Sequence, residues 1–389
     1  MKQSFADILR KIDDRADRKI AAKLPQWSGV DGIEIPSSLN FEQCSSSAAA
    51  MFKAKLLSEK AGASPRIADL TGGLGSDSWA FSRVAEKVLY NEMDPGLAGA
   101  VERNMGRLGV RNISISSIEI RPDNVELWKS GLEEFGPDII YADPARRSAS
   151  GKKVFLLEDC SPNILGILPV LIGIAPILAF KLSPMADMKM VASRLSGAGI
   201  RACGSRGLKD IYAIGLKGEV KELLCIMDRE FDGEYTIHAA DAVSEEEFCF
   251  RPSEEETAEA VYAHDFNVGD IVFEPSPAIL KTGAFKLLCA RYGMKKFAPS
   301  THLYIAPEAV APGRSLEIVE ILPLNGTNMK ILGKAHPHAE VCAMNIPMSS
   351  EQLSARMGVK PGPADCRIYG ASATEGRFLL VTKPLQPIL

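Results

Sequence analysis

The sequence predicts an α/β protein in which helices flank a mostly parallel β-sheet. A short apolar strand, Arg66 to Leu70, passes through a glycine-rich turn into a helix. From Ile164 to Phe180 the chain has 17 residues without a charge and two prolines, typical of a buried helix followed by a buried central strand. Two further strands, Asp210 to Leu216 and Glu219 to Met227, are joined by the hairpin signal Lys217-Gly218. We therefore expect a Rossmann-like, seven-stranded sheet whose last strand is antiparallel.

The composition is that of an ordinary soluble protein. Of 389 residues, 46% are hydrophobic and 24% charged, so the chain can bury two or three domain cores. A net charge of −4 argues against a uniformly basic nucleic-acid coat but leaves a local patch open. The eight cysteines contain no C-x-x-C pair, so we expect neither a zinc site nor a disulfide framework. The charged N-terminus is unlike a signal peptide, and we expect a cytoplasmic protein without membrane attachment.

The pattern along the chain predicts several segments, and the composition changes after Phe231. From Asp241 to Glu274 there are eleven acidic residues and one basic residue; from Lys281 to Arg314 there are six basic residues and one acidic residue. We expect an amphipathic N-terminal helix over Phe5 to Leu24. The predicted segments are a helical segment at 1–40, the α/β domain at 41–230, a ferredoxin-like α+β domain at 231–314 and a second α+β domain at 315–389.

The glycine turn after the first strand is the first candidate binding element. It carries Asp69, Thr71, Gly73 and Gly75, and a second strand, Lys87 to Met93, ends next to another acid, Glu92. Glycine lets the backbone bend sharply and approach a ligand, and the following helix offers unpaired N–H groups. The dinucleotide fingerprint G-x-G-x-x-G is absent, and an acid precedes the glycines.

Acid, glycine turn and second acid resemble the first two motifs of class I S-adenosylmethionine methyltransferases. The resemblance implies S-adenosylmethionine as cofactor, with the turn under its methionine part. It implies Asp69 near the amino group, often through water, and Glu92 as the acceptor of both ribose hydroxyl hydrogens. The other cofactor-binding candidates are Gln43, Ser45, Asp77, Met93 and Ser117.

A third motif, Asp143-Pro144-Ala145-Arg146, follows the predicted fourth strand. It resembles motif IV of enzymes that methylate exocyclic amines of bases, usually D-P-P-Y or N-P-P-F. Ala145 replaces the second proline and Arg146 the stacking aromatic residue. The related D-P-P-R of uracil-C5 enzymes needs a later cysteine nucleophile, and none follows the fifth strand. The resemblance implies catalytic roles for Asp143, Pro144 and Arg146, and we also place Asp143 beside the cofactor.

The quoted motifs, with E-P-S-P-A-I-L-K at 274–281 and the C-terminal α+β segment, resemble bacterial class I methyltransferases that carry a THUMP-like domain. This implies RNA as a partner. The basic stretch 281–314 also contains aromatic residues, a combination that suits single-stranded nucleic acid, but a solvated face over an ordinary core is the favoured interpretation of this stretch. Our hypothesis is methylation of a base amine in RNA. The alternatives are methylation of a small molecule or protein side chain, or a non-catalytic RNA-binding protein with this fold.

Five smaller expectations complete the sequence interpretation. Ser161 should cap the buried helix with Pro162 at its first position, and Asn104 should pack against the second-strand acid. We expect Met329 to Leu332 to be a strand and Ser350 to Met357 a helix. His336 and His338 are expected to be loop histidines, so no metal site is predicted.

Overall fold

The structure, a computed structural model, describes residues 18–146, 157–310, 312–360 and 366–385. These residues divide into two compact units. The first unit runs to Leu216 and includes Lys221–Tyr235 and Ala242–Ser244; the second contains the remaining residues up to the C-terminal region. Most of the predicted helix Phe5 to Leu24 lies outside the described residues, of which 18–23 are helical.

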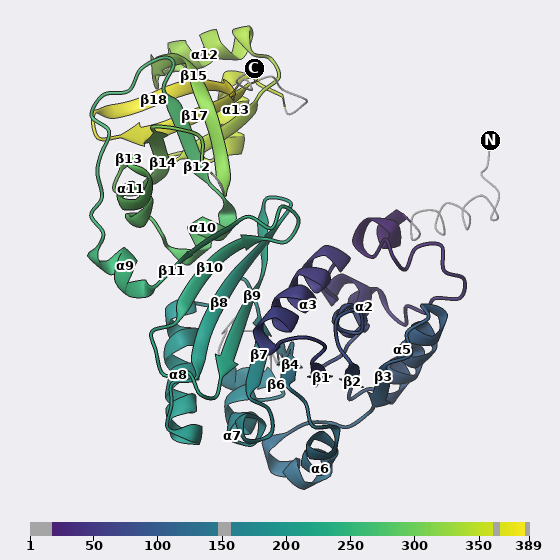
Figure 1. Ribbon diagram of the computed structural model, residues 1–389. Coiled ribbons are helices and arrows are strands. Elements are labelled where there is room, and N and C mark those ends of the chain that lie inside the picture. The colour runs from purple at the N-terminus through teal and green to yellow at the C-terminus, as the bar shows by residue number, and fades with distance from the viewer. Residues whose placement is uncertain (1–17, 147–156, 311, 361–365, 386–389) are drawn as a thin grey trace, which may run out of the picture. The chain divides into compact units, whose positions relative to one another are not determined.

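The first unit alternates strands and helices. Its strands are β1 (Arg66–Asp69), β2 (Lys87–Asn91), β3 (Ile113–Ser116), β4 (Ile139–Ala142), β5 (Ala145–Arg146), β6 (Cys160–Ser161), β7 (Ile177–Leu182), β8 (Leu208–Leu216) and β9 (Glu219–Asp228). Its helices are α2 (Ser38–Gln43), α3 (Ser47–Ala61), α4 (Ser76–Phe81), α5 (Pro95–Arg107), α6 (Val125–Phe135), α7 (Ile164–Ile174) and α8 (Met188–Cys203). Figure 1 shows α3 and α5 on one side of the strands and α6, α7 and α8 on the other.

The sheet order of the first unit is β8-β9-β7-β4-β1-β2-β3. The pairs from β7 to β3 are parallel, whereas β9 runs antiparallel to β7. This confirms the predicted sheet with an antiparallel strand. Two strands that follow in the chain, β10 (Thr236–Asp241) and β11 (Glu247–Phe250), bring the sheet to nine strands, two more than predicted. The difference arises because the chain stays extended after the residues assigned to the last strand.

Local sequence signals explain where the helices of the first unit begin. The Ser46 hydroxyl accepts a hydrogen bond from the Ala49 N–H at the start of α3, and Asp94 caps α5 with Pro95 at its first position. The predicted cap of α7 is wrong: Asn163, not Ser161, accepts the Gly166 N–H, and Ile164 is the first helical residue. Asn and Ser are equally good caps, so the sequence alone did not separate these positions.

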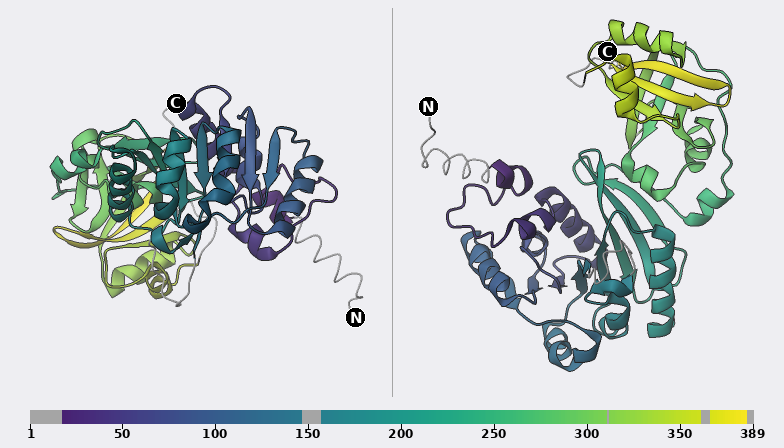
Figure 2. Two further views of the ribbon diagram at one scale, coloured as in Figure 1. Left: turned by 90° about the horizontal axis from the view of Figure 1, so that it is seen from below. Right: turned by 180° about the vertical axis from the view of Figure 1, so that it is seen from behind.

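The second unit contains a separate seven-stranded sheet of order β13-β14-β12-β15-β18-β17-β16. The strands are β12 (Ile271–Pro275), β13 (Lys295–Ala298), β14 (Thr301–Ala306), β15 (Gly313–Pro323), β16 (Glu340–Met344), β17 (Arg367–Ala373) and β18 (Gly376–Pro384). The helices are α9 (Pro252–Thr257), α10 (Pro277–Thr282), α11 (Leu287–Tyr292), α12 (Gly326–Ala335) and α13 (Ser350–Met357). The helical elements and this sheet can be followed in the two views of Figure 2.

Helices α12 and α13 cover one face of this sheet. Leu332 and Leu353 pack with Leu379 and Val381 in one apolar cluster, while Leu380 lies in a second cluster because alternate residues of a strand face opposite ways. The predicted helix Ser350–Met357 is confirmed.

The predicted strand Met329–Leu332 is wrong. These residues lie in α12, which Asn325 caps. A short apolar run fits a strand or a helix, and here the cap and the packing of Met329 and Leu332 decide for a helix.

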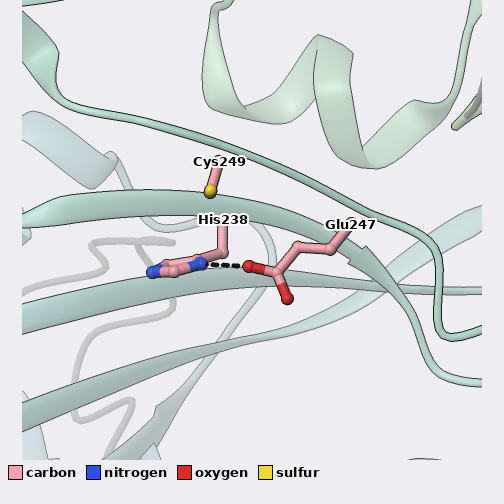
Figure 3. A group of neighbouring side chains, drawn as sticks. All are labelled: His238, Glu247 and Cys249. Atoms are coloured by element: carbon pink, nitrogen blue, oxygen red, sulfur yellow. Dashed lines mark hydrogen bonds and ion pairs between the residues drawn. The ribbon is translucent and has the colours of Figure 1, made fainter.

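The predicted boundary between residues 314 and 315 falls in β15, which pairs with β12. The two C-terminal segments therefore share one sheet. The strands β10 and β11 form an antiparallel pair in which His238 lies opposite Cys249 (Figure 3). In the described parts of the chain, no helix has the length and apolar character needed to cross a membrane.

Candidate active site

A cavity of about 1050 Å³ opens where the carboxyl ends of the parallel strands of the first unit meet. Loops after β1, β2, β4 and β7 contribute to its wall, together with residues between α2 and α3. In open α/β sheets, ligands bind outside the carboxyl ends of the strands. The cavity is at the upper end of the roughly 300–1,000 Å³ range of small-molecule sites, and so can hold a cofactor and part of a second molecule.

The glycine turn lines this cavity through Gly72 and Gly73. Gly73 has a φ of +52°, and a Cβ there would meet no atom closer than 3.9 Å. A Cβ on Gly72 would lie 2.0 Å from the buried Tyr90 ring, and Gly75 has a φ of +84° with Val101 and Met105 at 2.8 Å. The turn therefore needs glycine for packing at two positions and for backbone conformation at Gly73 and Gly75.

Asp69 lies beneath the turn and is only 1% exposed. Its carboxylate accepts hydrogen bonds from the Thr71 N–H at 3.1 Å and the Ser78 hydroxyl at 2.5 Å. Burial raises the Asp69 pKa to about 7, with the nearby Asp77 charge acting in the same direction. Asp69 thus stabilises the turn and the start of α4 through these two hydrogen bonds. It is not among the residues that line the cavity.

Glu92 is fixed at the cavity wall by two backbone hydrogen bonds. The Gly73 N–H donates to Oε2 at 3.0 Å, and the Asp94 N–H donates to Oε1 at 3.0 Å. Each carboxylate oxygen can accept a second hydrogen bond. A pair of oriented acceptors fits two adjacent hydroxyl groups, which is what the ribose of S-adenosylmethionine presents.

The third motif begins directly beside the glycine turn. The Asp143 N–H donates to the Thr71 hydroxyl at 2.6 Å, which ties the end of β4 to the turn. Ala145 and Arg146 form β5, which pairs with Ser161 and Cys160 of β6. Asp143, Pro144 and Ala145 line the cavity. The Arg146 side chain and all of Arg147 lie outside the described parts of the structure.

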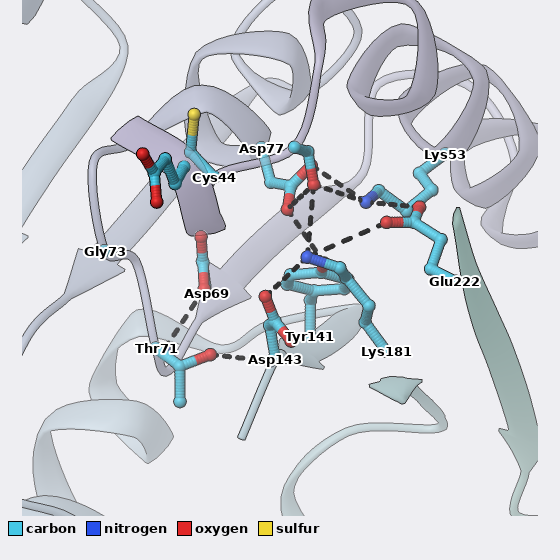
Figure 4. A network of polar contacts seen from close by, with 12 residues as sticks. Cys44, Lys53, Asp69, Thr71, Gly73, Asp77, Tyr141, Asp143, Lys181 and Glu222 are labelled. Carbon is cyan, nitrogen blue, oxygen red and sulfur yellow. Dashed lines mark hydrogen bonds and ion pairs between the residues drawn. The ribbon is translucent and has the colours of Figure 1, made fainter. Parts of the chain in front are cut away.

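A network of buried charges lies beside Asp143 (Figure 4). We call this network the floor; its charged members are Lys53, Asp77, Lys181 and Glu222. The Lys53 ammonium contacts Asp77 at 3.1 Å and Glu222 at 2.6 Å. Ser45 donates to Asp77 at 2.9 Å and accepts from Lys53 at 2.9 Å. The Tyr141 hydroxyl donates to the same Asp77 carboxylate at 2.9 Å.

Lys181 links this floor to the third motif. Its ammonium contacts Asp143 Oδ2 at 2.5 Å, Ser45 Oγ at 3.3 Å and Glu222 Oε2 at 3.7 Å. Burial disfavours the charged lysine, but Asp143, Glu222 and Asp77 outweigh it and hold the Lys181 pKa above its ordinary value. Burial likewise opposes ionisation of Asp77, yet Lys53 and Lys181 keep the Asp77 pKa below its ordinary value. Lys181 and Asp77 are therefore both ionised at neutral pH.

The structure brings most of the predicted site residues to one cavity. Those that line it are Gln43, Ser45, Thr71, Gly73, Asp77, Glu92, Met93, Asp143 and Pro144. Asp69, Gly75 and Ser117 are not among the lining residues. Ser117 instead donates to the Glu92 carbonyl oxygen at 2.9 Å. The neighbouring Ile118, Glu119 and Ile120 line the cavity at this point.

One other expectation is wrong. Asn104 exchanges two 2.8 Å hydrogen bonds with the Glu34 backbone, so its side-chain amide is bound there and not to the second-strand acid Glu92. The floor residues Lys53, Tyr141 and Glu222 were not found from the sequence. A lysine in the apolar strand β7 was a usable signal for Lys181, because lysine is rarely buried without a partner.

One solved structure resembles almost the whole chain. It comes from Porphyromonas gingivalis W83, is described as a "putative methyltransferase", and aligns over 96% of this chain and 89% of that chain with 29% identity and a TM-score of 0.83. A SAM-dependent methyltransferase from Aquifex aeolicus aligns over 50% of this chain and 98% of its own at 16% identity and a TM-score of 0.33. A "putative RNA methyltransferase" from Pyrococcus horikoshii aligns over 52% of this chain and 93% of its own at 17% identity and a TM-score of 0.32. The last two similarities are too low to support an argument.

The full-length similarity confirms the predicted methyltransferase fold. Residues 272–312 match a family of ferredoxin-like domains. No curated protein matches the sequence. With the glycine turn and the oriented Glu92 acceptors, the residues around the cavity fit S-adenosylmethionine as the cofactor.

Proposed function

We propose that this protein is an S-adenosylmethionine-dependent methyltransferase that acts on an exocyclic amine of a base in RNA. The observation that carries the proposal is the junction between Thr71 and Asp143, which places the amine-type motif beside the cofactor turn in one cavity. The cofactor supplies the methyl group when it is bound. Glu92 and the turn at Gly73 would hold it, and acidic side chains around the cavity suit its positive sulfonium.

Asp143 would orient the acceptor amine. One of its carboxylate oxygens is bound to Lys181, and within the described chain its Oδ1 has no protein partner, so this oxygen can accept an N–H of the amine. The Pro144 carbonyl would accept the other N–H, which aims the nitrogen lone pair at the methyl group. Alignment of this kind is the main contribution of such a site. A base in a folded RNA would have to leave its stack to reach it.

RNA as the partner rests on the third motif and on the resemblance to THUMP-containing enzymes. The stretch 281–314 contributes less than its sequence suggests, because Phe297 and Tyr304 are fully buried and the Lys296 ammonium donates to the Pro299 carbonyl. Phe285 stacks on His302, with ring centroids 3.7 Å apart. We therefore place the proposed acceptor specificity in the cavity.

The first test is calorimetric titration with S-adenosylhomocysteine. We expect Glu92→Ala to weaken binding about ten-fold or more, the scale of losing one or two hydrogen bonds to a charged group. Glu102→Ala, an exposed acid on α5, is the matched control and should bind like the wild type. Absence of binding to a folded wild-type protein would contradict the enzyme function and favour a non-catalytic protein.

The second test separates the acceptor from the cofactor. Asp143→Ala should abolish transfer of a labelled methyl group to cellular RNA and leave S-adenosylhomocysteine binding within a few-fold of the wild type. Loss of both activities in a folded variant would argue against the orienting role. Labelling that survives RNase treatment of the extract would instead support a small molecule or protein as acceptor.

A further inference from the structure

We propose that His238, Glu247 and Cys249 form a binding site for a zinc ion on the hairpin of β10 and β11. The site lies in the second unit, apart from the residues that line the candidate active site. The sequence predicts no metal site, since it lacks paired cysteines. The pairing register of the two strands brings these residues together, although their spacing in the sequence matches no common zinc motif.

The strand pairing places the three side chains on one face of the hairpin. His238 and Cys249 are direct cross-strand partners. Glu247 lies two residues before Cys249, and alternate residues of a strand point to the same side. Residues that lie opposite each other in an antiparallel pair have Cβ atoms about 4.5–5.5 Å apart, close enough to share one ligand. Figure 3 shows the three side chains turned toward one another.

The potential ligand atoms converge. One nitrogen, one oxygen and one sulfur atom from these residues all lie within 4.8 Å of one another. His238 Nδ1 is already in contact with a Glu247 carboxylate oxygen. In a tetrahedral zinc site with bonds of roughly 2.0–2.3 Å, ligand atoms are about 3.5 Å apart, so a shift of about 1 Å completes the geometry.

The chemistry of the set favours zinc over calcium or magnesium. Imidazole, thiolate and carboxylate are the three ligand types that zinc uses, whereas the hard cations prefer oxygen alone. Three protein ligands leave a fourth position for water. Binding would release the Cys249 thiol proton and break the His238–Glu247 contact, without any change in oxidation state.

Access and local charge are compatible with an ion. His238 is 7% exposed, whereas Glu247 and Cys249 are at the surface, so an ion can enter from solvent. Arg291 donates to the Cys249 carbonyl oxygen at 2.6 Å, and its charge is matched by Glu254 at 2.7 Å. Because Glu254 neutralises the charge of Arg291, this guanidinium should repel a bound metal ion only weakly.

The test uses the full chain, purified with a chelator and titrated with Co²⁺ as a spectroscopic substitute for zinc. We expect a thiolate-to-cobalt absorption band that saturates at one equivalent and is displaced by Zn²⁺. Cys249→Ser should remove the band, and Glu247→Gln should weaken binding about ten-fold or more. Both altered side chains are exposed, so folding should be retained. Cys203→Ser, which changes another exposed thiol, is the control and should keep the full band.

A second readout is the stability of the protein. Zn²⁺ should raise the denaturation midpoint of the wild type and of Cys203→Ser, and should leave that of Cys249→Ser unchanged, because a ligand stabilises only the state that binds it. The proposal is overturned if the wild type gives no thiolate band, if the band survives in Cys249→Ser, or if it disappears in Cys203→Ser.

Discussion

The two sides of the candidate active site are held together in different ways. On the cofactor side, Glu92 is fixed by the N–H groups of Gly73 and Asp94, all within 22 positions of one another in the chain. On the floor, Lys53 forms an ion pair with Glu222 and Lys181 forms one with Asp143, so residues from distant parts of the chain neutralise one another. The first side is built from local backbone geometry and the second from long-range ion pairs in the interior.

Because of this difference, removal of one side chain should have different consequences on the two sides. A carboxylate held by backbone groups can lose its side chain with little effect on the fold, because its partners stay in place and remain close to solvent. A buried ion-pair network loses its balance when one member is removed, since the remaining charges are left without compensation. Removal of the Glu92 side chain should therefore mainly affect ligand binding, and removal of Lys53 should mainly affect stability.

The largest expected effect comes from Lys53→Met. Lys53 is fully buried, and its removal leaves Asp77 and Glu222 as neighbouring buried acids. We expect a loss of roughly 3–5 kcal/mol in the free energy of unfolding, measured by urea denaturation. Lys129→Met is the matched control, because it breaks an exposed pair with Glu133 and should cost less than about 0.5 kcal/mol. Equal losses in the two variants would show that the floor is not a structural network.

The next effect concerns pH and Asp69. Because the pKa of buried Asp69 is about 7 in the folded protein, above its unfolded value, its contribution to stability is complete below about pH 4 and is lost as the pH rises through 7. This rise of the Asp69 pKa to about 7 corresponds to up to roughly 4 kcal/mol in the free energy of unfolding. Asp69→Asn should remove this part of the pH dependence.

The measurement is the free energy of unfolding between pH 4 and pH 8 for the wild type and the variant. The stability of the wild type relative to Asp69→Asn should fall over this range. Asp123→Asn changes an exposed acid and should run parallel to the wild type. A constant difference between the wild type and Asp69→Asn would mean that Asp69 is ionised throughout.

The smallest effect separates the two neighbouring glycines of the turn. Gly72→Ala would push a Cβ into the Tyr90 ring and should cost about 1–3 kcal/mol or more, as overpacking does. Gly73→Ala makes only an ordinary van der Waals contact, with the Thr71 carbonyl oxygen at 3.9 Å, and should cost only about 1 kcal/mol for its left-handed conformation. Denaturant midpoints of both variants give the comparison. A greater loss of stability in Gly73→Ala than in Gly72→Ala would contradict the close packing of Gly72 against the Tyr90 ring.

The sequence by itself determined much of the fold and the cofactor side of the site. Strand, turn and helix signals are local, so Arg66 to Asp77 and the hairpin signal at Lys217-Gly218 could be recognised without tertiary contacts. The acid Glu92 and the motif at Asp143 were found for the same reason, since each follows directly on a strand.

Only the tertiary structure decided which residues form the floor and how the last strands pair. Lys53 and Glu222 are separated by most of the first unit, and nothing in their local sequence links them. The placement of Asp69 beneath the turn, the helix at Met329 to Leu332 and the register that joins His238 to Cys249 also depend on packing. A charge pattern can be read along the chain, but its energy depends on distance and burial, and these exist only in the folded protein.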